Sequence, residues 1–407
     1  MMYDVAIVGG GPAGLTAAAE LAKSLNVIVL ERENEAGGIP RHSDHPGYGI
    51  RDMKSFLSGP AYARRLVRHA AGATIHTNTM VTGWAGDLTL ETTSPQGREQ
   101  IEARAVLLAT GARERPRSAR LIPGDRAAGI YTTGHLQNVV HLKHGTVGRR
   151  AVVIGAELVS YSAVLTLKHA GCRTELMTSE YASPESYGLF NAAGCTPLLG
   201  TNVATRTRLR RIIGKPTVQA VEVEHLDTGQ RRVINCDTVV LTGDWIPDHE
   251  LVRIGGLDLD SRTLGPVVDT ALSTSRPGVF AIGNLLHPVD TADIAALDGR
   301  HVAQHVHAYL AGHRRAEGGT RIEAAAPLRW IAPSLLRPGG PAPPRHRLLA
   351  WTDEFVRVPK VVARQNGKVI GRKTLPWPAA PGRVFRIPSS ILERYAPGEG
   401  SVTISVG

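Results

Sequence analysis

The first thirty residues change from a strand-like pattern of hydrophobic positions to a helix-like one and back. An apolar run over 4–8 precedes a cluster of glycines, an Ala/Leu-rich stretch extends to about residue 25, and a second apolar run covers 27–30. Short apolar runs bounded by glycine are typical of buried parallel strands, and the longer alanine-rich stretch is typical of a helix. The pattern predicts a strand–helix–strand unit of an α/β fold.

The turn after the first strand reads Gly-Gly-Gly-Pro-Ala-Gly over 9–14, and the second strand ends at Glu31. In a dinucleotide-binding loop, Gly9 permits the tight turn, Gly11 lets a pyrophosphate approach the backbone, and Gly14 lets the helix pack on the strand. A carboxylate at position 31 can accept hydrogen bonds from an adenosine ribose. Because strand, helix, glycine spacing and terminal acid agree, we predict a dinucleotide site here.

A second copy of this unit begins with a predicted strand over 150–154. Gly155 aligns with the first glycine, but Glu157 and Ser160 stand where the first copy has its second and third glycines. A carboxylate at the position nearest the pyrophosphate would crowd it and repel its charge, whereas serine is still small enough for close packing. The copy is therefore either a weakened NAD(P) site or a retained scaffold, and the sequence leaves both open.

Later apolar runs indicate that the first unit is re-entered after the second. Strands over 106–112 and 239–244 each end in a Thr-Gly turn, and a strand over 279–284 precedes a helix over 291–310. We predict an α/β fold of two Rossmann-like dinucleotide-binding domains, the second inserted in the first. The predicted boundaries are 1–115 with 270–312 for the first domain and 116–269 for the second.

The net charge of +11 belongs almost entirely to the C-terminal part of the chain. Residues 313–407 hold sixteen Lys/Arg and six Asp/Glu, a net of +10, so the remaining residues carry only +1. Prolines gather in 338–344, and short strand-like runs follow, with Asn366-Gly367 typical of a hairpin turn. We predict a Pro-rich linker over 313–344 and a small basic β domain over 345–407. Its charge fits a solvated surface or a docking face for an acidic partner, and no nucleic-acid recognition motif accompanies it.

Cysteine usage and hydropathy narrow the class of protein further. Cys172, Cys195 and Cys236 lie far apart, with neither a C-x-x-C pair nor metal-ligand spacing, so no metal site is predicted. No run approaches the roughly 20 apolar residues that a membrane-spanning helix needs. We expect a cytoplasmic protein without an integral membrane segment.

Together these motifs resemble the flavoproteins with two dinucleotide-binding domains, the pyridine nucleotide-disulfide oxidoreductase superfamily, over about residues 1–312. The resemblance implies FAD in the first domain and an Ala-Thr-Gly turn near the flavin at 109–111. It also implies a late Gly-Asp pair, which here is Gly283-Asn284. The cofactor contacts that it implies are Gly9, Gly11, Pro12, Ala13, Gly14, Glu31, Arg32, Gly38, Val81, Thr110, Gly111, Gly283, Asn284, Thr291 and Ala292.

The segment 37–49 decides the branch of this superfamily. Disulfide reductases carry a redox cysteine pair here or in the second domain, and this chain has no such pair. The pattern Gly-Gly-Ile-Pro-Arg-His instead looks like the FAD subunits of opine oxidase, hydrogen cyanide synthase and heteromeric sarcosine or proline dehydrogenases. Such subunits usually work with a second flavoprotein, so a partner subunit or a homo-oligomer is implied.

Flavin chemistry needs a group that manages a proton, and His42 and His45 are the candidates because imidazole titrates near neutrality. Arg41 can pair with a substrate carboxylate or remain solvated. We therefore expect an FAD-dependent oxidoreductase, not a disulfide reductase, that accepts hydride from a small amine, amino-acid or hydroxy substrate or relays electrons for a partner. The alternatives are an NAD(P)H-dependent reductase and a non-catalytic structural or electron-relay subunit.

Overall fold

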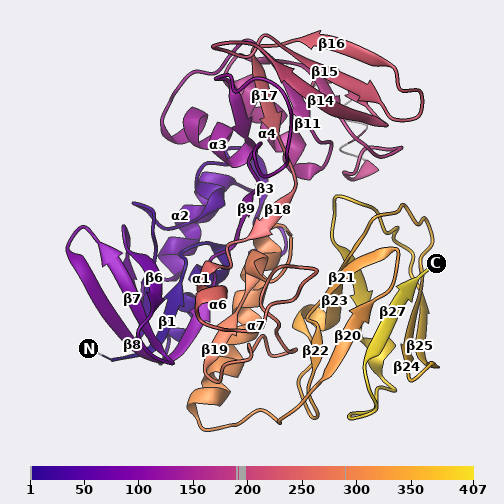
Figure 1. Ribbon diagram of the computed structural model, residues 1–407. Helices are drawn as coiled ribbons and strands as arrows, with labels where there is room; N and C mark the ends of the chain where they lie inside the picture. The colour runs from indigo at the N-terminus through magenta and orange to yellow at the C-terminus, as the bar shows by residue number, and fades with distance from the viewer. Residues whose placement is uncertain (1, 189–190, 192–198, 289) are drawn as a thin grey trace.

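The computed structural model of the protein describes residues 2–188, 191, 199–288 and 290–407. Its chain forms three domains, with the second and the C-terminal domains lying against different sides of the first (Figure 1). The first contains the chain's early strands and the long helix α7 (Ala292–Leu310), and the C-terminal domain consists of strands. The predicted α/β fold with two Rossmann-like units and a C-terminal β domain is confirmed.

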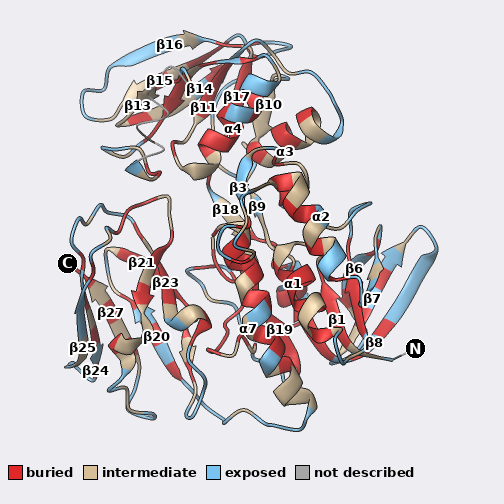
Figure 2. Ribbon diagram, turned by 180° about the vertical axis from the view of Figure 1, so that it is seen from behind, coloured by how far each residue is buried: buried red, intermediate tan, exposed pale blue. Residues whose placement is uncertain are grey.

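The first domain is built on a seven-stranded sheet in the order β5-β2-β1-β8-β7-β6, with β19 paired to β8. Its parallel part joins β5, β2, β1, β8 and β19, and the β6–β7–β8 part is antiparallel. The strands are β1 (Tyr3–Val8), β2 (Val27–Leu30), β5 (Thr74–His76), β6 (Met80–Trp84), β7 (Thr89–Ser94), β8 (Gly97–Leu108) and β19 (Val279–Ala281). β2 is buried along its whole length, as its continuous apolar run predicts. Buried residues also make up most of β1, its neighbour in the sheet (Figure 2).

Helices α1 (Pro12–Leu21), α2 (Gly59–His69) and α7 complete the first domain. α7 packs so closely on α1 that a Cβ at Gly299 would collide with the backbone at Ala13. The loops of the domain contain four short elements: η1 (Ile39–Arg41), β3 (Pro46–Tyr48), β4 (Leu57–Ser58) and η3 (Gly283–Leu285). This packing brings the start of α7 beside the glycine loop at the start of α1.

The second domain has a five-stranded parallel sheet in the order β10-β17-β11-β12-β13 and an antiparallel sheet β14-β15-β16. Its strands are β10 (Ile130–Thr132), β11 (Arg150–Ile154), β12 (Arg173–Thr178), β13 (Val203–Ala204), β14 (Thr207–Ile213), β15 (Ala220–His225), β16 (Arg231–Asn235) and β17 (Thr238–Leu241). Its helices are α3 (Thr133–Gln137), the π-helical turn η2 (Asn138–Leu142) and α4 (Leu158–His169). The predicted repeat of the strand–glycine–helix–strand unit is therefore present as β11–α4–β12.

The chain passes between the first two domains through two antiparallel strands, β9 (Ala112–Glu114) and β18 (Trp245–Pro247). After β18, the short helix α6 (Glu250–Ile254) and the segment to 272 pack into the core of the first domain through Leu251, Val252, Leu257, Val268 and Leu272. The predicted boundary at 269 therefore lies too late, and the return to the first domain occurs close to Pro247. The chain returns to the first domain directly after the Thr-Gly turn that ends β17. The prediction instead kept the residues after this turn, up to 269, in the second domain.

The C-terminal domain is a pair of sheets, β22-β20-β27-β24-β25 and β21-β23-β26. Its strands are β20 (Thr320–Ala324), β21 (Leu328–Ala332), β22 (Leu335–Leu336), β23 (Arg347–Thr352), β24 (Lys360–Gln365), β25 (Lys368–Thr374), β26 (Phe385–Pro388) and β27 (Val402–Val406), with short turns η4 (Pro344–His346) and η5 (Ser389–Leu392). The predicted linker over 313–344 is wrong for 320–336, because β20 alternates buried and exposed residues and belongs to this domain's core. Asn366 and Gly367 both have positive φ, as the predicted hairpin turn requires.

No helix among the residues that the structure describes is both long and apolar enough to cross a membrane. Within the same residues no three potential ligands among His, Cys, Asp and Glu gather to hold a metal ion.

Candidate functional site

The three glycines of the first loop are required for different reasons. Gly9 has a φ of +108°, and a Cβ there would collide with the carbonyl oxygen of Ala109. A Cβ at Gly14 would collide with the carbonyl oxygen of Gly9. Gly11 has an ordinary φ of −83°, and no described residue other than its chain neighbours has an atom within 4 Å of its Cβ position. The fold therefore requires Gly9 and Gly14, whereas the space above Gly11 is left for a ligand beside the N-terminus of α1.

Residues from three segments converge on this open space. Pro12 and Ala13 begin α1, and a Cβ at Gly38 would lie 2.9 Å from the Cα of Gly11. A Cβ at Gly283 would lie 2.9 Å from the Cβ of Ala13. The structure thus brings the predicted contacts at Gly38 and Gly283 to the first glycine loop, although they are far apart in sequence.

Glu31 lies buried at the end of β2, as the ribose-binding acid of the prediction would. Its Oε2 accepts a hydrogen bond of 2.8 Å from the Gly10 N–H, and its Oε1 accepts one of 2.8 Å from the Glu33 N–H. The Thr79 N–H donates to the carbonyl oxygen of Glu31, which places the start of β6, and with it Val81, beside this end of the site. The carboxylate is held in one orientation by the backbone and retains lone pairs for a ligand hydroxyl.

Asp248 ties the predicted contacts at Arg32, Thr110 and Gly111 to the segment that returns from the second domain. Arg32 is exposed and its Nη1 donates to Asp248 Oδ2 at 3.0 Å. The hydroxyl of Thr110 donates to the Asp248 carbonyl at 2.8 Å, and the Asp248 N–H donates to the carbonyl of Gly111 at 2.9 Å. The hydroxyl of Thr110 is therefore already engaged in this link between segments.

The N-terminus of α7 carries a polar atom without a protein partner. The hydroxyl of Thr291, the N-cap residue, is buried and makes no hydrogen bond within the described residues. Ala292 begins the helix, whose first N–H groups carry partial positive charge and suit the electron-rich edge of a flavin. Asn284 is engaged differently, because its amide pairs with the backbone of Asp290 at 2.9 and 3.1 Å. A ribityl contact of Asn284 therefore stays a prediction.

These features fit FAD. The open space above Gly11 suits a pyrophosphate, the buried carboxylate of Glu31 suits an adenosine ribose, and the unpartnered hydroxyl of Thr291 suits a flavin edge. All three lie at the carboxyl ends of the parallel strands, where ligands of open α/β sheets bind.

The two candidate catalytic histidines lie where the loop after β2 meets the second domain. The Nδ1 of His42 lies 3.2 Å from Oε1 of Gln137, at the end of α3. Gln137 also donates to the hydroxyl of Ser162 on α4 at 2.7 Å. Burial lowers the pKa of His42, so its imidazole is neutral at neutral pH. The sequence did not identify Gln137 or Ser162, because nothing local to either residue marks a contact across domains.

His45 is arranged as a neutral base. Its Nδ1 lies 2.9 Å from the carbonyl oxygen of Pro46, a group that can only accept, so Nδ1 carries the proton. Its Nε2 lies 3.1 Å from the hydroxyl of Ser43 and is left as an acceptor. Burial lowers the pKa of His45, and its ring lies 5.4 Å from the ring of Tyr48. His45 can therefore accept a proton through Nε2, directly or through the Ser43 hydroxyl.

Arg41 and His287 both have protein partners. Nη2 of Arg41 lies 3.2 Å from the carboxylate of Glu35, and Nη1 donates to the Glu35 carbonyl, so its guanidinium is neither solvated nor free for a substrate. His287 stacks on Trp330 of the C-terminal domain with 5.0 Å between the ring centroids. Burial lowers the pKa of His287. It serves a contact between domains.

The second glycine loop is occupied by the protein itself. Glu157 is the N-cap of α4, and its side chain and that of Ser160 form a reciprocal capping box. The residue keeps part of its surface open to solvent, yet its carboxyl group lies among many protein atoms, and this burial raises its pKa to about 8. The nearby carboxylates of Glu185 and Glu114 contribute to the same rise. A negative pyrophosphate would meet a carboxyl group here instead of open space.

A segment of the C-terminal domain, residues 379–388, lies over this second loop, and we call it the covering segment. Gly382 packs on the side chain of Glu185, and a Cβ at Gly382 would lie 3.4 Å from the Cβ of Glu157. The guanidinium of Arg383 lies 4.9 Å from the ring centroid of Tyr187. Burial raises the pKa of Glu185 to about 7. The sequence did not predict this contact, because it joins residues nearly 200 positions apart.

Arg386 of the covering segment also reaches the flavin side of the molecule. Its Nη2 lies 3.1 and 3.2 Å from the two carboxylate oxygens of Asp290, and its side chain faces Tyr187. Asp290 in turn accepts a hydrogen bond from the Thr291 N–H at 2.8 Å. One arginine thus links the C-terminal domain to the start of α7 and to the second domain.

The described cysteines are not arranged for redox chemistry. Cys172 and Cys236 are buried free thiols, and burial raises their pKa values to about 11 and about 12. A thiol with so high a pKa is a poor nucleophile at neutral pH. Cys195 lies outside the described residues.

Comparison with known proteins places this geometry in context. The family model described as pyridine nucleotide-disulphide oxidoreductase matches residues 3–309. An opine oxidase subunit of Agrobacterium tumefaciens is 26% identical over 310 residues, covering 69% of this chain but only 61% of that protein. A ferredoxin–NADP reductase of Gluconacetobacter diazotrophicus is 28% identical over 313 residues, covering 73% of this chain and 85% of that protein.

The solved structures agree on the fold. The thioredoxin reductase of T. acidophilum superposes with a TM-score of 0.65 at 21% identity, covering 75% of this chain and 98% of that one. L-proline dehydrogenase from P. horikoshii gives a TM-score of 0.55 at 19% identity over 75% of this chain and 55% of that one. The family match ends at residue 309, before the first strand of the C-terminal domain.

Proposed function

Because the chain belongs to the pyridine nucleotide-disulphide oxidoreductase family of flavin-dependent oxidoreductases, we propose that it accepts hydride from a small amine, amino-acid or hydroxy substrate. Under the same proposal it either turns that substrate over itself or relays electrons for a partner subunit. FAD is its redox group, and NAD(P)H is not its reductant. The observation that carries the proposal is the contrast between an open first glycine loop and a second loop filled by Glu157 and the covering segment.

Each part of the first site has a role in this proposal. The backbone at Gly11 and the N-terminus of α1 hold the pyrophosphate, Glu31 holds the ribose, and Thr291 orients the flavin edge. FAD supplies a ring system that takes up two electrons and a proton equivalent from a substrate. His45 accepts the substrate proton through Nε2, and His42 fixes the loop against the second domain through Gln137.

The same proposal includes a substrate other than a disulfide. Both described cysteines are buried and have raised pKa values, and a disulfide relay needs two adjacent reactive thiols. We therefore propose an FAD subunit of the opine oxidase type, and the 26% identity to one such subunit supports this proposal. A second flavoprotein subunit or a homo-oligomer completes this proposal.

The test uses the purified, flavin-loaded protein under anaerobic conditions. NADH and NADPH are added separately, and the absorbance of the oxidised flavin is followed by stopped flow. Dithionite provides the control that the bound flavin can be reduced. We expect bleaching with dithionite and none with either nicotinamide nucleotide on the timescale of a turnover. Rapid bleaching by NADH would overturn the proposal and establish the NAD(P)H-dependent alternative.

A substrate panel read by the same bleaching signal separates the remaining alternatives. It contains secondary amines, amino acids and 2-hydroxy acids. Bleaching by one class identifies the substrate class of a competent enzyme. If every class fails with the isolated chain, the same panel is repeated with subunits that co-purify from the native source, and bleaching there shows a relay subunit.

A further inference from the structure

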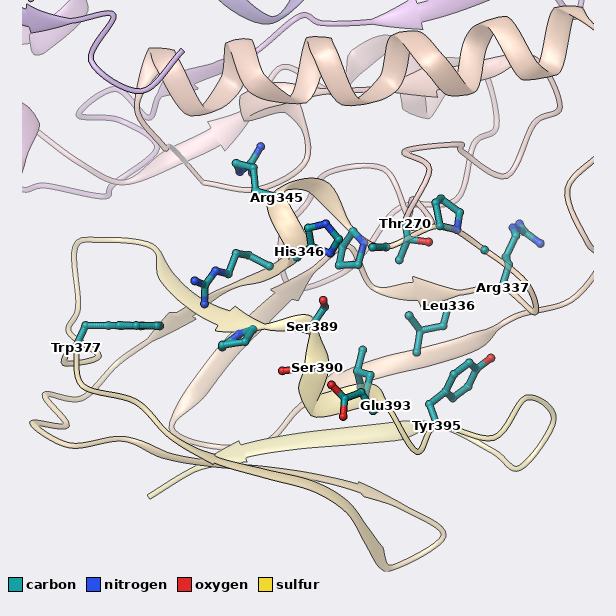
Figure 3. A pocket seen from close by; sticks show the side chains of 17 residues that line it. Thr270, Leu336, Arg337, Arg345, His346, Trp377, Ser389, Ser390, Glu393 and Tyr395 are labelled. Carbon is teal, nitrogen blue, oxygen red and sulfur yellow. The ribbon is translucent and has the colours of Figure 1, made fainter. Parts of the chain in front are cut away.

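A pocket of about 760 Å³ opens between the C-terminal domain and the first domain (Figure 3). None of the residues that line it belongs to either glycine loop. Its walls come from Thr270 in the first domain, the proline-rich segment 340–347, and the segment 388–395 around η5. The volume lies in the range of pockets that hold small organic molecules. The flavin-dependent function proposed above does not use this pocket.

The pocket carries an excess of positive charge. Arg337, Arg345 and Arg347 line it, against the single carboxylate of Glu393. Arg337 and Arg345 are neutralised from behind, by Asp269 at 2.8 Å and by Asp298 on α7. Figure 3 shows Arg345 extending from the pocket wall toward a helix of the first domain. Arg347 has no carboxylate partner among the described residues, so its charge remains available to a ligand.

Arg347 is held in place by an aromatic ring. Its guanidinium lies 5.2 Å from the ring centroid of Trp377, a cation–π contact that fixes the plane of the group and leaves its N–H donors unpaired by any protein acceptor described here. Leu336, Pro341 and Leu392 form apolar surface nearby, and the hydroxyls of Ser389 and Ser390 have no protein partner among the described residues. A planar cation beside apolar walls and free hydroxyls is suited to a carboxylate attached to an apolar body.

The backbone beside the pocket is strained. Arg345 and the adjacent His346 both have left-handed conformations, with φ of 58° and 54°. A left-handed conformation is unfavourable for residues other than glycine, and strained residues of this kind cluster at functional sites. Both residues line the pocket, and the strain orients Arg345 toward α7 and Arg347 toward Trp377.

We propose that this pocket binds a small organic anion, a carboxylate with an apolar body, through Arg347 on Trp377, and that the bound anion acts on the flavin helix α7. Two contacts make the link. Arg345 pairs with Asp298 in the middle of α7. The indole N–H of Trp377 donates to the carbonyl oxygen of Arg386 at 3.0 Å, and Arg386 pairs with Asp290 at the start of α7.

The binding test uses the full-length flavin-loaded protein. Benzoate is the carboxylate probe, inorganic phosphate is the probe for a bare anion, and benzyl alcohol is the uncharged control. Binding is measured by calorimetry and by tryptophan fluorescence. We expect benzoate to bind, phosphate to bind at least about tenfold more weakly, and benzyl alcohol not to bind. Equal binding of phosphate would show a bare-anion site and overturn the assignment of an organic carboxylate.

Variants locate the binding. Arg347→Ala is expected to weaken benzoate at least about tenfold, and Arg347→Lys to recover only part of the loss because ammonium lacks the planar fork. Arg329→Ala is the matched control, since Arg329 belongs to the same domain, lies outside the pocket and is exposed. If Arg347→Ala fails to fold, Arg347→Lys and Trp377→Phe carry the test. Unchanged benzoate affinity in these variants, or no benzoate binding to the wild type, would overturn the proposal.

The link to α7 has its own readout. Saturating benzoate is expected to shift the absorbance or fluorescence of bound flavin in the wild type, and the shift is expected to disappear in Arg386→Gln while benzoate still binds. A flavin spectrum that does not respond to bound benzoate would remove the link to α7. A failed nicotinamide test leaves this result unaffected, because neither probe nor variant involves the second glycine loop.

Discussion

The two glycine loops of the chain share a backbone path but differ in what fills the space beside the helix. Gly9 and Gly155 both have positive φ, of +108° and +128°, and both precede a helix that begins after the turn. No described residue other than its chain neighbours has an atom within 4 Å of the Cβ position of Gly11, whereas the corresponding position of the second loop holds Glu157, capped into α4 and covered by Gly382. The glycine motif thus combines Gly9 and Gly14, which the fold requires, with Gly11, which only a bound ligand requires.

The difference also shows how a dinucleotide unit can persist without its ligand. In the second loop Ser160 replaces the third glycine, and its hydroxyl lies 2.6 Å from that of Thr242 on the neighbouring strand end. Glu157 and Ser160 form the capping box at the N-terminus of α4, where a phosphate would otherwise lie. One of the protein's own side chains, with a raised pKa, thus takes the place of an external anion.

The largest effect is expected from placing the second loop's acid in the first. Gly11→Glu puts a carboxylate in the open space, so the purified protein should retain at least about tenfold less flavin than the wild type, measured by absorbance after gel filtration. Gly86→Glu is the control, because Gly86 is exposed, has no left-handed φ, and its Cβ position meets only ordinary contacts with the side chain of Thr89. A yellow Gly11→Glu protein would refute the assignment of the first loop.

The next largest effect is expected from the ion pair between Arg386 of the covering segment and Asp290 at the start of α7. Arg386→Gln leaves the buried carboxylate of Asp290 without its partner, which should cost about 3 kcal/mol in the free energy of unfolding. Chemical denaturation measures the loss, and Arg386→Gln combined with Asp290→Asn should recover part of it. No recovery in the double variant would show that Arg386 acts through packing alone.

The covering of the second loop can be broken at a single glycine. Gly382→Ala places a methyl group against Glu185 and should cost about 1–3 kcal/mol more than Gly398→Ala. Gly398 is the matched control, since its φ of +83° is similarly left-handed to the +75° of Gly382 but its Cβ position is open. The unfolding temperatures of both variants are compared with that of the wild type. Equal decreases would mean that the covering segment moves to accommodate the methyl group without loss of stability.

The last expected effect, and the hardest to isolate because Glu185 titrates over the same range, is a pH dependence from Glu157. Burial raises its pKa from the usual value of 4.5 to about 8, so between these values the folded protein keeps a proton that the unfolded chain has lost. Stability from this residue is full below pH 4.5, falls as the pH rises, and is lost above about 8. The unfolding temperature should fall less steeply with pH in Glu157→Gln than in the wild type over this range. Glu185, whose pKa is about 7, should still contribute a pH dependence in the variant. An unchanged slope would contradict a buried neutral Glu157.

Local sequence signals predicted the parts of the fold that depend on neighbouring residues. The apolar runs and glycine spacing located β1, α1 and β2, the repeat at β11–α4–β12, and the helix that the structure has as Ala292–Leu310. The hairpin at Asn366-Gly367 followed from the same kind of local requirement. Each of these features depends on a few consecutive side chains, so one sequence is enough to find it.

Contacts between distant segments were missed, and they decide what the second loop can do. The prolines of 338–344 favoured the prediction of a linker, although β20 nearby has the alternating pattern of a strand. The return of the chain to the first domain near Pro247 is not marked by any change in composition. Gly382 on Glu185 and Arg386 on Asp290 depend on how two domains meet, which no local pattern records. The sequence could show that Glu157 disfavours a pyrophosphate, but not that the chain itself covers the position.

The insertion of the second domain gives the chain an order of assembly during synthesis. The second domain is complete once residues near 247 have been made, while the first still lacks β19 and α7. The first domain can close only when α7 emerges, and the Arg386–Asp290 contact forms later still. The open first glycine loop and the start of α7 are therefore synthesised before the covering segment that contacts Asp290.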